Sequence, residues 1–235
     1  MGELQDRRAR KKARTRGEIR SVAQRLFAAR GFDAVTIADI AAQADVAVQT
    51  VFNHFATKEE LFFDGRTPWV EGAAEAVRSR PEGVPPLRAL REYLVAVVGR
   101  LAGAATTTER RDYLATLQGS PSLRSYELGL VHEAEQRLAV VLNEVWSAEE
   151  EAPADPQTTA AIVASTWLAI CRVLLTGQRP LLDSRAEAGQ SAERIEALAE
   201  RLLAPLEEGL PMLDAALAGT APGVTGWPAG ALRAG

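Results

Sequence analysis

Residues 36–62, "TIADIAAQADVAVQTVFNHFATKEELF", contain the feature that most restricts the fold of this chain: two short amphipathic segments separated by three residues. The first segment begins at Thr36, and the second covers residues 48–55, after the break Asp45-Val46-Ala47. Both have the apolar spacing of a helix, but a helix of about eight residues is only marginally stable in water. We therefore expect both helices to pack against another part of the chain.

The preceding segment can supply that packing surface. Apolar side chains recur along residues 14–30 with the spacing of one helix face, and they are Ile19, Val22, Ala23, Leu26 and Phe27. Gly31 then predicts the end of this helix. Two short helices held on a longer one predict a helix-turn-helix unit, whose second helix normally lies in the major groove of DNA.

A fourth helix is predicted to follow this unit. Thr57 and Glu60 have the spacing of a capping box, and the helical pattern continues to about residue 79. Gly65 and Pro68 are expected to bend or split this helix. Lys58 and the N-terminus of the helix would supply positive potential for a phosphate group.

The segment 48–55 has two different sides when its residues are placed at about 100° intervals. One side is apolar and is expected to face the core: Val48, Val51, Phe52 and Phe55. The other side is polar but uncharged, with a neutral histidine: Gln49, Thr50, Asn53 and His54. Gln and Asn can pair with an adenine edge, and Thr can offer a methyl or a hydroxyl group. An ordinary solvent-exposed face would hold more Glu, Lys and Arg, so this face favours base readout.

The charge of the chain is distributed unevenly. Residues 1–30 hold ten Lys or Arg and three acidic residues, whereas the whole chain has a net charge of −4. A basic N-terminus on an acidic body indicates a polyanionic partner for one part of the chain only. A solvated, disordered tail is the alternative interpretation for residues 1–15.

The remainder of the chain predicts only helices. Ala, Leu, Glu and Arg are abundant, and no strand-like alternation occurs, which favours an all-α fold. We expect three short helices in front, forming the helix-turn-helix domain, and about six longer helices behind. The predicted limits are a DNA-binding domain with a basic arm at 1–66, a second helical domain at 67–218, and a disordered tail at 219–235.

Several classes of protein do not fit the sequence. A single cysteine, Cys171, excludes an intrachain disulfide framework and a Cys-based zinc site. No apolar core follows the basic N-terminus, so we expect no signal peptide, and we expect no apolar run of the roughly 18 residues that span a membrane. An enzyme is disfavoured, because the common catalytic motifs are missing and only two histidines occur. We therefore expect no catalytic residue, no metal and no cofactor.

Residues 14–64 resemble the DNA-binding domain of TetR-type (tetracycline-repressor-like) transcriptional regulators. The resemblance lies in "RLFAARGF", in the Thr that starts the second helix, in the His-Phe pair that ends the third, and in "TKEEL". It implies a cytoplasmic homodimer that binds a palindromic operator in double-stranded DNA through two such motifs. It also implies that a small molecule in the C-terminal domain releases the DNA.

The resemblance also assigns residues to the DNA interface. Thr36 and Lys58 would contact phosphates, Val48, Gln49, Thr50 and Asn53 would face bases, and Phe52 and His54 would meet the backbone. Val48 and Phe52 thus have two interpretations, because the helix periodicity turns them toward the core. Three positions depart from the family pattern: Asp45 replaces a turn Gly, Ala47 replaces a capping Ser or Thr, and Phe52 replaces a Tyr.

The C-terminal part of the chain is less informative. The nearly all-apolar helix at 158–175 and the last helix are candidates for the dimer interface, as the family implies, or for an ordinary core. Amphipathic candidates for an effector pocket are Tyr93, Tyr113, Tyr126, His132, Trp167 and Arg172, although a lone residue of this kind is more often part of the core than a ligand contact. The resemblance, with the predicted domain of 67–218 as the ligand-binding and dimerisation domain, implies a ligand-responsive repressor. The alternative is a ligand-independent or architectural DNA-binding protein.

Overall fold

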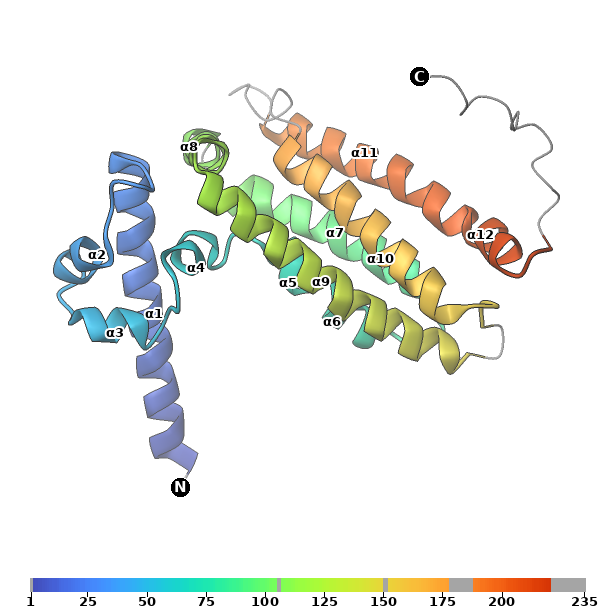
Figure 1. Cartoon of the computed structure of the whole chain (residues 1–235), viewed down its shortest axis with the longest axis horizontal. Coiled ribbons are helices and arrows are strands. Elements are labelled where there is room, and N and C mark those ends of the chain that lie inside the picture. Colours follow the sequence, from blue (N-terminus) through green and yellow to red (C-terminus); the bar gives the residue numbers. More distant parts are fainter. Residues whose placement is uncertain (1, 105–106, 150–151, 178–187, 221–235) are drawn as a thin grey trace, which may run out of the picture.

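The computed structural model describes residues 2–104, 107–149, 152–177 and 188–220, and every regular element in these ranges is helical (Figure 1). This confirms the predicted all-α class. In chain order the elements are α1 (Gly2–Arg30), α2 (Ile37–Gln43), α3 (Val48–Phe52), α4 (Lys58–Phe63), α5 (Pro68–Glu71), α6 (Ala73–Arg78), α7 (Pro86–Ala104), α8 (Thr107–Gly119), α9 (Pro121–Ser147), α10 (Pro156–Arg172), the π-helical turn η1 (Val173–Gly177), α11 (Ala188–Glu208) and α12 (Leu210–Leu217).

Helix α1 is longer than the sequence predicted. Its C-terminal half buries Ile19 and Phe27 against α2 and α4, while residues 6–14 are exposed and extend beyond the rest of the unit (Figure 1). The sequence placed the helix start near residue 14, where the apolar stripe begins. Arg, Lys, Ala and Glu have high helix propensity, so they extend a helix that tertiary packing has already nucleated.

The turn between α2 and α3 is tight. Asp45 has φ 52°, the left-handed conformation that a Gly would adopt more easily. Thr36 and Asp39 form a complete capping box at the start of α2. Ala47 makes no side-chain cap at the start of α3, as its lack of a hydroxyl requires. The helix α3 ends at Phe52, three residues before the predicted limit.

The predicted fourth helix is split into α4, α5 and α6. Gly65 has φ +72°, and Pro68 starts α5, so the break between α4 and α5 falls where the sequence indicated, whereas the break at Gly72 was not predicted. At Gly72, between α5 and α6, an added Cβ would lie 2.1 Å from Tyr93 Oη. Because Gly72 has no side chain, Tyr93 of α7 can approach the α5–α6 corner closely. There its Oη donates a hydrogen bond to the Pro68 carbonyl at 2.5 Å.

The buried side chains form two clusters. The first lies among α1–α4 and includes Phe27, Phe55 and Phe62, together with Leu117 of α8 and Leu123 of α9. The second fills the larger helical bundle, in which α10 packs on α9 and α11 packs on α7 (Figure 1). Helix α9 contributes side chains to both clusters, so it joins the two parts of the molecule.

Helix α10 contradicts the expectation that the chain contains no apolar run long enough to span a membrane. The segment Pro156–Leu175 has 20 residues and a mean hydropathy of 1.7, which satisfies the length and composition of a membrane span, and 44% of its most apolar window is buried inside the protein. A buried core helix meets the same criterion. Its buried side packs on α9 and includes Val163 and Trp167.

The C-terminal helices end within the described residues. Pro205 lies inside α11, and Gly209 separates that helix from α12. Of the tail predicted at 219–235, residues 221–235 lie outside the described residues.

Candidate nucleic-acid interface

Helix α3 has one buried side and one exposed side, but the division differs from the predicted one. Val51 and Phe55 are 0% and 1% exposed, whereas Val48 and Phe52 are 42% and 47% exposed. The prediction that the last two face the core is therefore wrong. The supporting helices α1 and α2 cover a single i, i+4 stripe of this short helix, so the neighbouring apolar stripe faces solvent.

The polar side chains of α3 also face outward. Gln49 and Asn53 are exposed, and Gln49 Nε2 donates to Asn53 Oδ1 at 3.2 Å. Thr50 is half-buried on the same helix. Together with Val48 and Phe52, these residues form a surface without formal charge, which we call the α3 face.

His54 lies at the C-terminal edge of the α3 face. Its Nδ1 is buried without a hydrogen-bond partner, whereas its ring is only partly covered. Burial lowers the pKa of His54, and the positive charges of Lys12 and Arg16 lower it further. The imidazole is therefore held in its neutral form, which can donate one N–H group.

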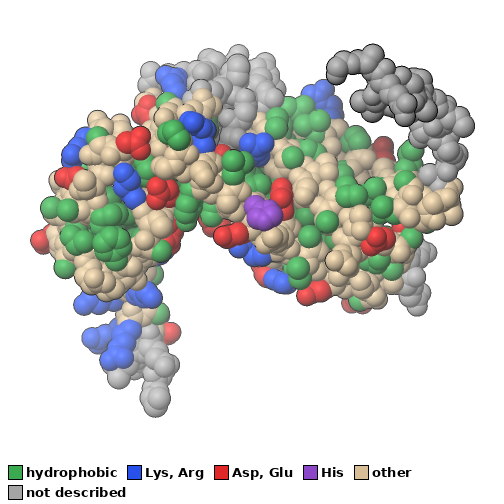
Figure 2. All heavy atoms as spheres, in the orientation of Figure 1, with side chains coloured by type: hydrophobic (Ala, Val, Ile, Leu, Met, Phe, Trp, Pro, Cys, Tyr) green, Lys and Arg blue, Asp and Glu red, His purple; other side chains and the backbone are tan. Residues whose placement is uncertain are grey.

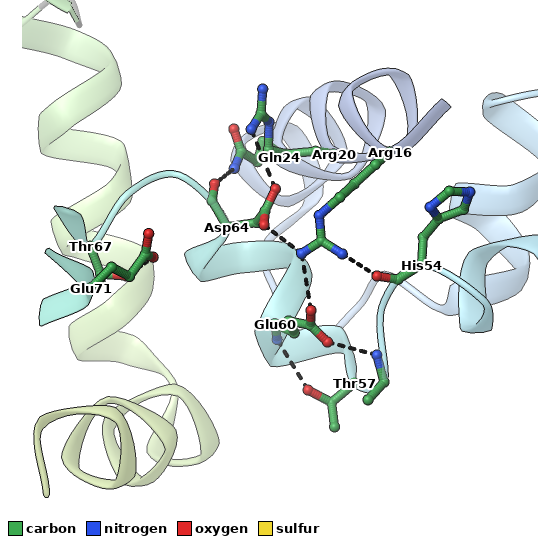
Figure 3. Close-up of polar contacts among 10 residues, drawn as sticks. Arg16, Arg20, Gln24, His54, Thr57, Glu60, Asp64, Thr67 and Glu71 are labelled. Atoms are coloured by element: carbon green, nitrogen blue, oxygen red, sulfur yellow. Dashed lines mark hydrogen bonds and ion pairs between the residues drawn. The ribbon is translucent and has the colours of Figure 1, made fainter. Parts of the chain in front are cut away.

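Arg16 fastens the C-terminal end of the α3 segment to α1 and α4 (Figure 3). Its guanidinium donates to the His54 carbonyl, to Glu60 Oε1 at 3.0 Å and to Asp64 Oδ1 at 2.6 Å. The same group lies 4.0 Å from the centre of the Phe55 ring. Sequence reasoning counted Arg16 only as a basic residue, because its partners lie 38 to 48 positions away.

Further contacts complete this clamp. Arg20 Nη1 lies 3.3 Å from Asp64 Oδ2, and Gln24 Nε2 donates to the Asp64 carbonyl at 3.2 Å (Figure 3). Glu60 accepts from the Ala56 N–H group at 2.7 Å. The predicted capping box is therefore only half formed, since Thr57 Oγ1 accepts from the Glu60 N–H group but the Glu60 carboxylate does not return to Thr57.

The two residues expected to contact phosphates lie in different settings. Thr36 is exposed, and its hydroxyl donates to Asp39 Oδ2 at 2.7 Å. Lys58 Nζ donates to the carbonyls of Phe32 and Val35, both at 3.0 Å, and lies 4.2 Å from the Phe32 ring centre. Two of its three N–H groups thus hold the α1–α2 loop, and its phosphate contact stays a prediction.

Positive charge gathers beside the α3 face. Figure 2 shows basic side chains along the projecting end of α1 and an apolar patch on the adjoining lobe over α2 and α3. The exposed basic residues of this arm are Arg7, Arg8, Arg10, Lys11, Lys12 and Arg14. Each lies three or four residues from another cation, an arrangement that destabilises an isolated helix and is relieved by a polyanion.

Two of the predicted pocket residues lie elsewhere, at the junction between the two parts of the molecule. The Tyr113 ring stacks on Phe62 with centroids 4.9 Å apart, and Tyr126 stacks on Phe63 at 5.6 Å. The Arg66 guanidinium lies 5.0 Å from the Tyr113 ring centre. Burial raises the pKa of Tyr113 well above its usual value. These side chains connect α4 to α8 and α9.

The other predicted pocket residues are scattered. Tyr93 bonds to the Pro68 carbonyl, and His132 is exposed with its Nε2 3.0 Å from Gln136. Trp167 is buried in the bundle, and its Nε1 has no hydrogen-bond partner among the described residues. Arg172 is exposed on α10 and opposes the burial-induced rise in the pKa of Glu127. The structure thus gathers no shared pocket from this set.

Sequence reasoning missed two buried polar residues of the bundle. Thr159 is fully buried on α10 and its Oγ1 has no partner among the described residues, while Glu127 is 8% exposed on α9. In the sequence, each is a single polar residue within a hydrophobic helix pattern. Such residues occur in most helices, so the pattern did not indicate that these two are buried. Within the described ranges, no group of three or more His, Cys, Asp or Glu side chains could hold a metal ion.

The sequence of the chain is similar to known regulatory proteins. Residues 19–64 match the family model described as bacterial regulatory proteins, tetR family. The HTH-type transcriptional regulator TcmR of Streptomyces glaucescens is 30% identical over 171 residues, which cover 71% of this chain and 74% of that protein.

Solved structures with low sequence identity are also similar. NalD, the secondary repressor of the MexAB-OprM multidrug efflux pump in Pseudomonas aeruginosa, aligns with a TM-score of 0.48 and 20% identity over 78% of this chain and 96% of NalD. A TetR-family regulator from Mesorhizobium loti aligns with a TM-score of 0.48 and 18% identity over 82% of this chain and 96% of that one. From the family match at the DNA-binding helices and the identity to TcmR, we conclude that this chain belongs to the TetR family of transcriptional regulators.

Proposed function

We propose that the protein is a cytoplasmic transcriptional repressor that binds a palindromic operator as a homodimer and leaves it when a small molecule binds. The observation that carries the DNA-binding part is the α3 face. Its five side chains are uncharged, Gln49 and Asn53 project outward, and the basic arm of α1 lies beside it. An α-helix fits the major groove, where base edges offer hydrogen bonds and methyl groups, and the arm would contact phosphates.

The dimer would form through α10 and α11. The exposed side of α10 has no charged residue between positions 157 and 171, and it consists of small or apolar side chains with two hydroxyls: Ala161, Ile162, Ser165, Thr166 and Ala169. Leu202 of α11 is also exposed. Two copies of this surface would pair as a four-helix interface with twofold symmetry.

An effector would bind within the larger bundle. Two buried polar atoms of α10, Trp167 Nε1 and Thr159 Oγ1, have no protein partner in the described part of the chain. Leaving such a group unpaired costs about 1–3 kcal/mol, and a ligand with a suitable acceptor or donor would remove that cost. Pairs such as Phe62 with Tyr113 would carry the change to α4.

The test is selection of bound duplexes from a random library, followed by sizing of the protein–DNA complex. We expect a palindromic site with half-sites about 34–36 Å apart, or a multiple of that distance, and two chains per duplex. A panel of small molecules should then contain compounds that raise the melting temperature and release the duplex. Bound DNA without a repeated half-site, or a single chain per site, would contradict the homodimer. A DNA complex that no compound releases would favour a ligand-independent protein.

A further inference from the structure

The α3 face contains an apolar stripe that the fold leaves uncovered. Val48 and Phe52 lie four positions apart, hence one above the other on the helix, and each exposes more than two fifths of its surface. In the described ranges no other element covers them. An exposed aromatic side chain next to an exposed valine is unfavourable in water, so the stripe indicates a contact with an apolar partner.

The neighbouring residues indicate what that partner is. The amide pair Gln49–Asn53 forms the adjacent stripe of the same helix, and the basic arm of α1 flanks both. A polyanion fits the positive charge of the arm, and a duplex combines that negative charge with apolar groups in its major groove.

The chemistry of the major groove then narrows the choice. Among the four base pairs, the C5-methyl group of thymine is the apolar group that the major-groove edge presents. Phe52 has no hydroxyl, so its contact with DNA cannot be a hydrogen bond from the side chain. Val48 likewise offers only methyl groups.

We propose that Val48 and Phe52 contact thymine methyl groups and so specify T·A base pairs in each half-site. This inference rests on the proposed DNA-binding function. The adjacent amide pair suits the same base pairs: with Gln49 Nε2 donating to Asn53 Oδ1, the Gln49 oxygen remains to accept and the Asn53 nitrogen to donate. Adenine presents the matching donor and acceptor, N6 and N7.

The experiment replaces thymine by deoxyuridine, which lacks only the methyl group. The probe is the duplex that the wild-type protein selects from a random library, and each thymine is replaced in turn. Removing one buried methyl corresponds to about fourfold weaker binding. We expect this loss at one or two thymines per half-site and no change at the others, measured by fluorescence anisotropy at one salt concentration.

The protein variants test which side chains contact the methyl groups. Val48→Ala and Phe52→Ala should each reduce the ratio of affinities for thymine and deoxyuridine from about four toward one at a sensitive position. Val140→Ala, which shortens a side chain that is 54% exposed on α9, should leave that ratio unchanged. The wild-type comparison needs no variant, so it stands even if a variant folds poorly.

The outcomes separate this inference from the proposed function. If the protein selects a duplex but no deoxyuridine substitution weakens binding, the thymine contact is refuted while DNA binding stands. The same holds if Val48→Ala and Phe52→Ala both keep the full preference for thymine. If no duplex is selected at all, both the DNA-binding function and this inference are refuted.

Discussion

Replacement of Arg16 by alanine tests whether the clamp, rather than the charge of α1, holds the α3 face in place. The guanidinium makes two ion pairs with carboxylates, at 2.6 and 3.0 Å, and its side chain remains 34% exposed. Partly solvated pairs of this kind contribute about 0.5–1 kcal/mol each. The hydrogen bond to the His54 carbonyl adds about 1 kcal/mol, and the contact with the Phe55 ring adds about 0.5–1 kcal/mol.

We therefore expect Arg16→Ala to lower the free energy of unfolding by about 2.5–4 kcal/mol, the sum of these contributions, measured by urea denaturation followed by circular dichroism. Hydrogen exchange should localise the effect, with faster exchange in α3 and α4 and unchanged exchange in α10. Arg16→Lys should fall between, because lysine keeps the charge but loses the planar fork that reaches both carboxylates.

Arg14→Ala is the matched control on the same helix. Arg14 pairs with Glu18 at 2.9 Å, but the two side chains are 81% and 58% exposed, and such a pair contributes little. Both variants remove one positive charge near the DNA. If Arg16→Ala proves no more destabilising than Arg14→Ala, while both weaken DNA binding equally, Arg16 acts only as a cation and the clamp is refuted.

Three further predictions follow from single contacts. Gly72→Ala should destabilise the bundle by about 1–3 kcal/mol in a thermal melt, because a Cβ would lie 2.1 Å from Tyr93 Oη; Tyr93→Ala in the same chain should recover part of the Gly72→Ala effect. Lys58→Met should lower stability, because two of the Lys58 N–H groups hold the α1–α2 loop, and loss of the predicted phosphate contact through the third should reduce the slope of log affinity against log salt by about one unit, as binding titrations at several salt concentrations will show. Lowering the pH from about 7.5 to about 5.5 should lower the melting temperature of the wild type more than that of His54→Asn. The pKa of His54 is lower in the folded chain than its value near 6.5 in the unfolded chain. The unfolded chain therefore binds the proton first, and stability is lost as the pH falls through this window.

The fold class and the helix-turn-helix were predictable because local signals agree with the packing. The Gly31 and Thr36 signals, the break at Asp45 and the Gly65–Pro68 split all fall at helix ends in the structure. Each of these signals reflects the backbone conformation or cap that one residue type favours. The helix ends can therefore be predicted without knowing the tertiary contacts. The length of α1 was not predictable in this way, because its first half lacks an apolar stripe.

The orientation of Val48 and Phe52 shows where periodicity fails. A wheel of residues 48–55 groups four apolar side chains within one arc, but a helix of only five residues contacts its neighbours along a single stripe. The partners on α1 and α2 decide which stripe that is, and Val51 and Phe55 occupy it. Hydrophobicity therefore indicated that these residues need a partner, but it did not indicate that the partner lies outside the chain.

Lys58 and the arm of α1 together suggest how affinity and specificity are divided. Similarity to a motif predicts which residue type occupies a position, but not which hydrogen bonds that residue makes within the protein. Lys58 binds two carbonyls that lie 23 and 26 positions away in the sequence, so these contacts could not be predicted. Because two of the Lys58 N–H groups already hold the α1–α2 loop, the exposed cations of the arm are the larger source of positive charge beside the α3 face. Phosphate contacts set affinity and salt dependence, whereas base contacts set sequence preference. Removing arm cations should thus weaken binding to all duplexes alike, while changes at Val48, Phe52 or Asn53 should alter which duplex is preferred.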